Sequence, residues 1–201
     1  MDISAPRIPI LVGARVNLIE LMSTDAPKLV VWMNDPVVTG HLAFFSHGGR
    51  VTAEDEIRYI EQMRNSHVDC LFGVLMPEAS QEGYIGTIGL HEIDMANLSE
   101  PEGMIDNHHN TARLGILMRP EWSGKGYAAD AVHTILRFAF EYLGLNRVQA
   151  KIVLTNARSI RFFRNIGFRP EGVEVQAYRR GAQYEDMLRL AILADEWRLT
   201  P

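Results

Sequence analysis

The stretch that decides the fold is RPEWSGKGYA, residues 119–128. It lies between a predicted strand over 112–118 and a predicted helix over 127–143. The start of a helix exposes unpaired backbone N–H groups and a partial positive charge, so it can bind an anion. Glycines at 124 and 126 allow backbone angles and close approaches that other residues resist. The stretch therefore predicts either a tight strand-to-helix turn or a phosphate-binding loop.

Two nucleotide-binding motifs fit this loop poorly. A P-loop needs Ser or Thr after the Gly-Lys pair, and Gly126 follows Lys125. The dinucleotide fingerprint needs a third glycine three residues after the second, where Ala129 stands. Alanine is tolerated there, but no initial βαβ unit precedes the loop. A nucleotide-binding protein that merely shares a glycine turn remains the weaker alternative.

Working outward from the loop, strands and helices share the chain without an evident linker. Alternating apolar residues, capping residues and glycine or proline breaks predict the boundaries. The predicted strands are 16–21, 70–75, 84–90, 112–118, 147–154, 173–178 and 187–193, and the predicted helices are 24–33, one opening at 52, 127–143 and 157–166. We expect an α+β (or α/β) fold in a single domain over residues 1–201.

Composition narrows the class of protein. Of the 201 residues, 47% are hydrophobic and 22% charged, which is typical of a globular protein. The formal charge of -5 gives no general attraction to nucleic acid or to anionic membranes. Cys70 is the one cysteine, so no intrachain disulfide can form, and no signal peptide or spanning segment is evident. These features predict a cytoplasmic protein that binds neither nucleic acid nor membrane.

With its neighbouring motifs, the loop resembles the GNAT superfamily of N-acetyltransferases. The superfamily signature is Gln/Arg-x-x-Gly-x-Gly/Ala at a strand-to-helix junction, and residues 121–126 match it, with Glu121 in the first position. That departure concerns the side chain at position 121 and leaves the backbone cradle intact. The resemblance is greatest to the branch of ribosomal-protein N-terminal (Rim-type) acetyltransferases, whose motifs recur here in order over about residues 13–198. They are WMNDP (32–36), TNARSI (155–160), FFRNIGF (162–168), EG (171–172), GAQYED (181–186) and DEW (195–197).

The resemblance implies a fold and a cosubstrate. The GNAT fold has a mixed, mostly antiparallel central sheet flanked by helices, with a V-shaped splay between the fourth and fifth strands that admits the pantetheine arm of acetyl-CoA. It implies no metal cofactor. The residues that the resemblance assigns to acetyl-CoA are Leu117, Met118, Gly124, Lys125, Gly126, Tyr127, Ala128 and Asn156. For Asn156, an N-cap of the following helix is an equally good interpretation.

The implied reaction is transfer of the acetyl group to a primary amine by direct attack in a ternary complex. Many superfamily members carry a Tyr acid where this chain has Phe163. In the Rim-type branch the proposed acid is the serine that corresponds to Ser159, which as a helix residue can instead bond its own backbone. We expect Glu92 to be the general base, with His91 and Asp35 as alternatives, and a solvated surface position is open for each.

Other readings remain open. Asp106 and the histidines at 91, 108 and 109 are a weak zinc signal, so we expect no metal site. A catalytically degenerate protein that binds acyl-CoA as a sensor or scaffold is the alternative to an enzyme. We expect the acceptor amine to belong to a protein N-terminus or to a small molecule, and the protein to be a monomer or a homodimer.

Overall fold

The computed structural model describes residues 10–39, 50–77, 83–95 and 109–198. These residues fall into two compact units. Of the described residues, the first unit comprises 10–39, 50–77, 83–89 and 115–135, and the second comprises 90–95, 109–114 and 136–198. Strands β4 (Gly86–Asp94) and β5 (Thr111–Met118) contribute residues to both units. The single domain over residues 1–201 stays a prediction.

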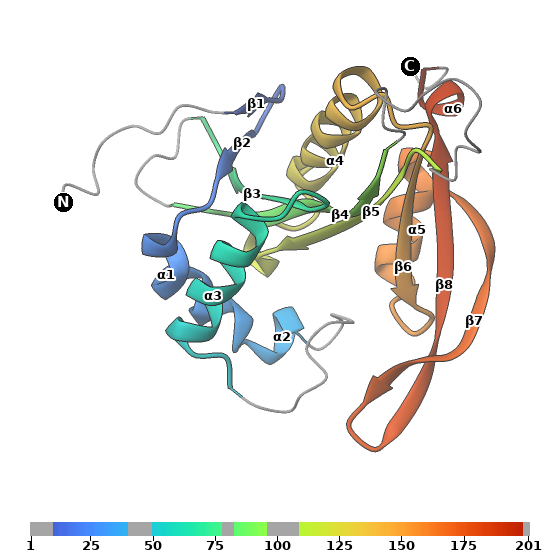
Figure 1. Cartoon of the computed structure of the whole chain (residues 1–201). Helices are drawn as coiled ribbons and strands as arrows, with labels where there is room; N and C mark the ends of the chain where they lie inside the picture. The colour runs from blue at the N-terminus through green and yellow to red at the C-terminus, as the bar shows by residue number, and fades with distance from the viewer. Residues whose placement is uncertain (1–9, 40–49, 78–82, 96–108, 199–201) are drawn as a thin grey trace. The chain divides into compact units, whose positions relative to one another are not determined.

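The first unit orders its strands β1-β2-β3-β4. The strands are β1 (Leu11–Val12), β2 (Asn17–Glu20), β3 (Cys70–Leu75) and the beginning of β4. Pairing is antiparallel between β1 and β2 and between β2 and β3. In Figure 1, α1 (Ala26–Met33) and α3 (Ala53–Arg64) lie side by side. Their buried residues Leu29 and Ile60 share a core cluster with Ile19 of β2 and Leu21 just after it, so these helices cover one face of the sheet.

Capping chemistry sets the start of α3 as predicted. The Thr52 hydroxyl accepts a hydrogen bond from the Asp55 backbone N–H at 3.2 Å, and the Asp55 carboxylate accepts one from the Thr52 N–H at 3.0 Å. This reciprocal pair is a capping box that uses Asp in place of Glu.

Asn34, from the WMNDP motif, fastens the segment between α1 and α3. Its Nδ2 donates to the carbonyls of Val30 and Val51, and its Oδ1 accepts the Val51 N–H, each at 2.9 Å. Both ends of the 35–50 stretch, which includes the short helix α2 (Pro36–Thr39), are therefore held by one side chain.

The second unit orders its strands β5-β6-β8-β7. They are the beginning of β5, then β6 (Arg147–Val153), β7 (Arg169–Arg180) and β8 (Gln183–Leu193). Strands β7 and β8 form a long antiparallel hairpin (Figure 1), and β6 pairs with β8 along its whole length, also antiparallel. Strand β5 pairs with β6 in parallel, Thr111 opposite Arg147 through Arg113 opposite Gln149. The predicted mixed, mostly antiparallel sheet is confirmed.

The predicted fourth and fifth strands are β5 and β6, because the two-residue β1 precedes them. Their described register is confined to the first residues of each strand. Pairing over only these three residues is consistent with a V-shaped splay. That β5 and β6 separate after Arg113 stays a prediction.

The helix expected over 127–143 differs from the prediction at its end. α4 runs Tyr127–Arg137 and passes into a π-turn, η3 (Phe138–Tyr142), in which the Leu143 N–H donates to the Phe138 carbonyl at 3.0 Å. A regular helix over 127–143 would place Tyr142 on the apolar face with Val132, Ile135 and Ala139. The wider turn shifts the helical phase, so Phe140 is buried and Tyr142 is 75% exposed. α5 (Ala157–Ile166) and the closing helix α6 (Ala194–Arg198) complete the chain. No helix within the described residues is long and apolar enough to span a membrane.

Candidate active site

The glycine loop, residues 119–128, belongs to the first unit and joins β5 to α4 through a short 3₁₀ turn, η2 (Pro120–Trp122). Gly124 and Gly126 have φ angles of 75° and 85°, in the left-handed region that favours glycine. A Cβ placed on Gly124 would meet nothing within 4 Å, so the backbone borders open space. Tyr127 follows directly as the first residue of α4. The loop therefore presents bare backbone at a helix N-terminus, which is the chemistry that a pyrophosphate needs.

Aromatic and charged side chains brace the loop. The Lys125 Nζ lies 4.6 Å from the centroid of the Trp122 ring, and that ring meets the Tyr127 ring edge-on at 5.8 Å between centroids. The buried Trp122 Nε1 has no hydrogen-bond partner among the described residues. A cation held over an aromatic face is attracted by the ring quadrupole. These contacts keep an ammonium group at the loop.

Glu121, the departure from the family signature, has a structural explanation. Its carboxylate forms an ion pair with Arg119, whose guanidinium also lies over the Trp32 ring, 5.4 Å from the centroid. A hydrogen bond from its own backbone N–H, with the charges of Arg119 and Lys125, holds the pKa of Glu121 below its usual range. The negative charge at position 121 is thus compensated within the loop.

The end of β5 is held close to β4 within the first unit. The Arg119 N–H donates to the Ile85 carbonyl at 2.9 Å. A Cβ on Gly86 would lie 2.3 Å from the Leu117 carbonyl oxygen and 2.6 Å from the Met118 Sδ. Only glycine at position 86 leaves room for this approach. Leu117 and Met118, both half-buried, are therefore fixed at the residues that lead into the loop.

A second contact to the loop comes from the segment before β2, which sequence reasoning missed. The Asp130 carboxylate accepts backbone N–H groups from Ala14, Arg15 and Val16 at 3.1, 2.8 and 2.9 Å. The Arg15 Nη1 donates to the Lys125 carbonyl at 2.5 Å. These residues lie more than a hundred positions apart in the chain, so no local spacing pattern could have revealed the contact.

In the second unit, Asn156 is the N-cap of α5. Its Oδ1 accepts the Ser159 backbone N–H at 3.0 Å, which satisfies one donor of the first helical turn. The Nδ2 group is the part of Asn156 with donors for a ligand. Ser159 is half-buried in that same turn.

Phe163 is a core residue. It is 3% exposed and meets Phe162 and Phe168 edge-on, at 5.3 and 5.0 Å between ring centroids. Gly167, with a φ of 110°, ends α5 as predicted.

Glu92, the expected general base, lies in the second unit and forms an ion pair. Its Oε1 accepts from the Arg113 Nη2 at 2.9 Å, and its backbone has a left-handed φ of 54° within β4. The hydrogen bond from Arg113 lowers the pKa of Glu92. An efficient base has a pKa near the working pH, so this pairing makes Glu92 a weaker proton acceptor.

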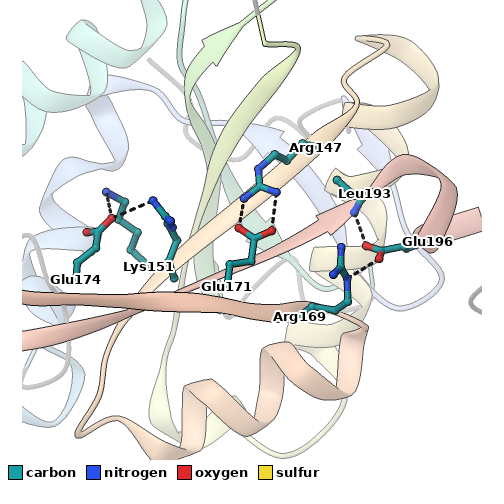
Figure 2. A network of polar contacts seen from close by, with 8 residues as sticks. Arg147, Lys151, Arg169, Glu171, Glu174, Leu193 and Glu196 are labelled. Carbon is teal, nitrogen blue, oxygen red and sulfur yellow. Dashed lines mark hydrogen bonds and ion pairs between the residues drawn. The ribbon is translucent and has the colours of Figure 1, made fainter.

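The Glu-Gly motif at 171–172 has a structural role in the second unit. Figure 2 shows the Arg147 guanidinium and the Glu171 carboxylate facing each other through two contacts, so the pair is bidentate. In the same view, Lys151 contacts Glu174 at 3.1 Å, and Arg169 pairs with Glu196. These ion pairs connect β6, β7 and the helix after β8.

The histidine-rich stretch gives no metal site in the described part of the chain. Residues 106 and 108 lie outside the described residues, and the His109 N–H donates to Asp94 at 3.2 Å. Within residues 10–39, 50–77, 83–95 and 109–198, no group of three or more His, Cys, Asp or Glu side chains is arranged to hold a metal ion.

The sheet and the glycine loop together are typical of one class of proteins. Residues 15–169 match the family model of the acetyltransferase (GNAT) domain, and the chain belongs to this family. The matched residues include the glycine loop, Glu92, Asn156 and Ser159.

Relatives of known sequence and structure agree. An uncharacterized N-acetyltransferase, p20, from Bacillus licheniformis is 27% identical, over 91% of this chain and 95% of its own length. The spermidine N(1)-acetyltransferase of Vibrio cholerae is 25% identical, over 69% of this chain and 73% of its own. Among solved structures, the V. cholerae spermidine N-acetyltransferase in complex with CoA and spermine superposes with a TM-score of 0.75 at 20% identity, covering 92% of this chain and 99% of that one. At that identity the likeness establishes the GNAT fold.

Proposed function

We propose that this protein transfers the acetyl group of acetyl-CoA to a primary amine by direct attack in a ternary complex. The observation that carries the proposal is the glycine loop: two left-handed glycines with open space at Gly124, at the start of α4, inside a region that matches the GNAT family. Acetyl-CoA supplies an activated acetyl thioester. Solved GNAT-fold neighbours at 18–20% identity hold CoA or acetyl-CoA, which supports this choice of cosubstrate.

The cofactor roles follow from what each group offers. Backbone N–H groups of residues 124–128 are assigned to the pyrophosphate, because the first turn of a helix leaves them unpaired. Backbone groups of Leu117 and Met118 are assigned to the pantetheine amides and the thioester carbonyl. One preorganised oxyanion donor is worth about 3–4 kcal/mol. The Asn156 Nδ2 is assigned to the cofactor arm, a role compatible with its cap through Oδ1.

Two side chains are proposed to move protons. Ser159 is the proposed acid for the leaving thiolate, and Glu92 the proposed base for the amine. Arg113 lowers the pKa of Glu92 and so weakens Glu92 as a proton acceptor, which makes the role of Glu92 the first one to test. Loss of a general base lowers kcat by roughly 10²–10⁴-fold. If Glu92→Gln changes kcat less than tenfold, Glu92 is not the base, and the same measurement on Ser159→Ala decides the acid.

The acceptor is proposed as a protein N-terminal α-amine or a small-molecule amine. The Rim-type motifs favour the former, as does a putative ribosomal N-acetyltransferase of Bacillus subtilis, 29% identical over 112 residues. The spermidine acetyltransferases favour a polyamine. A screen of peptides with free N-termini and of polyamines for thiol release separates the two.

Thermal unfolding with and without acetyl-CoA is the first test, with ATP and NAD as controls. At about 100 times its dissociation constant a ligand adds roughly 2.7 kcal/mol, or about 5–10 °C for a chain of this size. A shift with acetyl-CoA alone supports the proposal, and no shift at millimolar concentration overturns it. Binding without thiol release for any amine favours the sensor or scaffold alternative.

A further inference from the structure

Arg15 contacts the glycine loop from outside the expected motif, and its side chain makes two separate contacts there. The Nη1 donates to the Lys125 carbonyl at 2.5 Å. The guanidinium carbon lies 4.6 Å from the centroid of the Tyr127 ring, over its face. A planar guanidinium is suited to such a pair of contacts, because it can donate in its plane while it stacks.

Gly126, which has no side chain, leaves space for the guanidinium of Arg15 in its present position. A Cβ on Gly126 would lie 2.5 Å from the Arg15 Nη1, so the guanidinium would have to shift from its present position. A Cβ on Gly124 would meet nothing within 4 Å. The two glycines of the signature therefore differ in role: Gly124 faces open space, and Gly126 leaves room for Arg15.

The backbone of Arg15 is anchored to the same helix. Its N–H donates to the Asp130 carboxylate, as do those of Ala14 and Val16 on either side. Asp130 belongs to the first turns of α4. Because the backbone of Arg15 is already fixed, less conformational entropy is lost when its guanidinium binds the Lys125 carbonyl.

Peptide geometry converts this contact into an effect on the ligand. In a trans peptide the C=O and the next N–H point in opposite directions. Holding the Lys125 carbonyl toward Arg15 therefore turns the Gly126 N–H away from Arg15. A guanidinium beside a helix N-terminus is also electrostatically unfavourable by itself, and the arrangement improves when an anion binds at that terminus.

We propose that Arg15 is a positioning residue for the phosphate-binding loop. By holding the Lys125 carbonyl, it aims the Gly126 N–H, and with it the start of α4, at the pyrophosphate of acetyl-CoA. Arg15 itself lies on the opposite side of that peptide from the phosphate. This inference rests on the proposed function.

The test compares Arg15→Met, which keeps the stem and loses the donors, with Arg15→Lys, which keeps one cationic donor. Arg58→Met is the matched control, because Arg58 is an exposed arginine of the same unit, paired only with Asp55 on its own helix among the contacts described. The first measurement is the Kd for CoA by calorimetry. The second is the kinetics of thiol release with acetyl-CoA and with acetyl-pantetheine, which lacks the pyrophosphate. The third is the rate of amide exchange of residues 119–131 without ligand.

Arg15→Met is expected to weaken CoA binding about tenfold or more, the equivalent of one charge-assisted hydrogen bond. It should raise KM for acetyl-CoA with kcat little changed, leave kcat/KM for acetyl-pantetheine unchanged, and speed amide exchange in 119–131. Arg15→Lys should recover part of the affinity, and Arg58→Met should match the wild type.

Wild-type CoA affinity in Arg15→Met overturns the inference while the proposed function stands. An equal loss with acetyl-pantetheine also overturns it, since a general structural defect would not distinguish the two substrates. If the wild-type protein itself binds no CoA, the proposed function fails and this inference fails with it.

Discussion

Replacing Asp130 by alanine removes the acceptor that three consecutive backbone N–H groups share. The bonds measure 3.1, 2.8 and 2.9 Å, and they attach residues 14–16 to α4. Hydrogen bonds to a charged group contribute about 1.5–3 kcal/mol each when their partner is removed. Ala14 and Arg15 are exposed, so water replaces much of what they lose, whereas Val16 is fully buried.

We therefore expect Asp130→Ala to lower the free energy of unfolding by about 2–4 kcal/mol, after a gain of about 0.5 kcal/mol from the helix propensity of alanine. Asp130→Asn keeps one acceptor oxygen without its charge and should lose about half as much. The measurement is the urea midpoint at pH 7, followed by tryptophan fluorescence and far-UV circular dichroism. Glu141→Ala, an exposed carboxylate in the π-turn after α4, is the control. A loss below about 0.5 kcal/mol for Asp130→Ala, with an unchanged m-value, would refute the reasoning.

Two carboxylates, one in a surface ion pair and one buried, should give the free energy of unfolding opposite dependences on pH. The hydrogen bond from Arg147 lowers the pKa of Glu171, so the pair stabilises the fold above the ordinary glutamate pKa, and that contribution is lost as pH falls through the lowered value. Because solvent screens this pair, Glu171→Gln should lower the free energy of unfolding by only about 0.5–1 kcal/mol at pH 7 and by almost nothing near pH 2 in urea titrations, and an equal cost at both pH values would contradict this. Burial raises the pKa of Glu56 to about 7. The folded protein therefore has its full stability below the pKa of Glu56 in the unfolded chain, and it loses stability as pH rises from there through 7. Glu56→Gln should gain about 2 kcal/mol relative to the wild type between pH 5 and pH 8, and a difference that does not vary with pH would show that the carboxyl keeps its ordinary pKa.

Local signals in the sequence were enough to predict the elements near the site. The capping box at Thr52 and Asp55, the N-cap Asn156 and the left-handed Gly167 all involve residues within a few positions of one another. Their interactions depend on helix geometry alone, so spacing reveals them. The burial of Phe163 also follows from its place on the apolar side of a short helix.

The misses have a common physical cause. Tyr142 is exposed because one π-turn changes the helical phase, and nothing in the spacing of apolar residues marks that turn. Arg15 meets Lys125 only once β2 and α4 have packed. The Arg113 partner of Glu92 likewise comes from the next strand. Pairings between distant segments depend on strand register and packing, so the local spacing of residues in one sequence does not predict them.

The Asn34 contacts have a consequence for engineering. The Asn34 side chain connects the backbone of residue 30 to that of residue 51. Its hydrogen bonds therefore offset part of the free energy of closing the stretch between them, and they do so independently of the sequence of that stretch. Loop closure itself costs only about 0.6 kcal/mol more for each doubling of length. Val38 of α2 is buried, so a graft that keeps residues 34–39 and Val51 and changes only the segment between them should cost the core little.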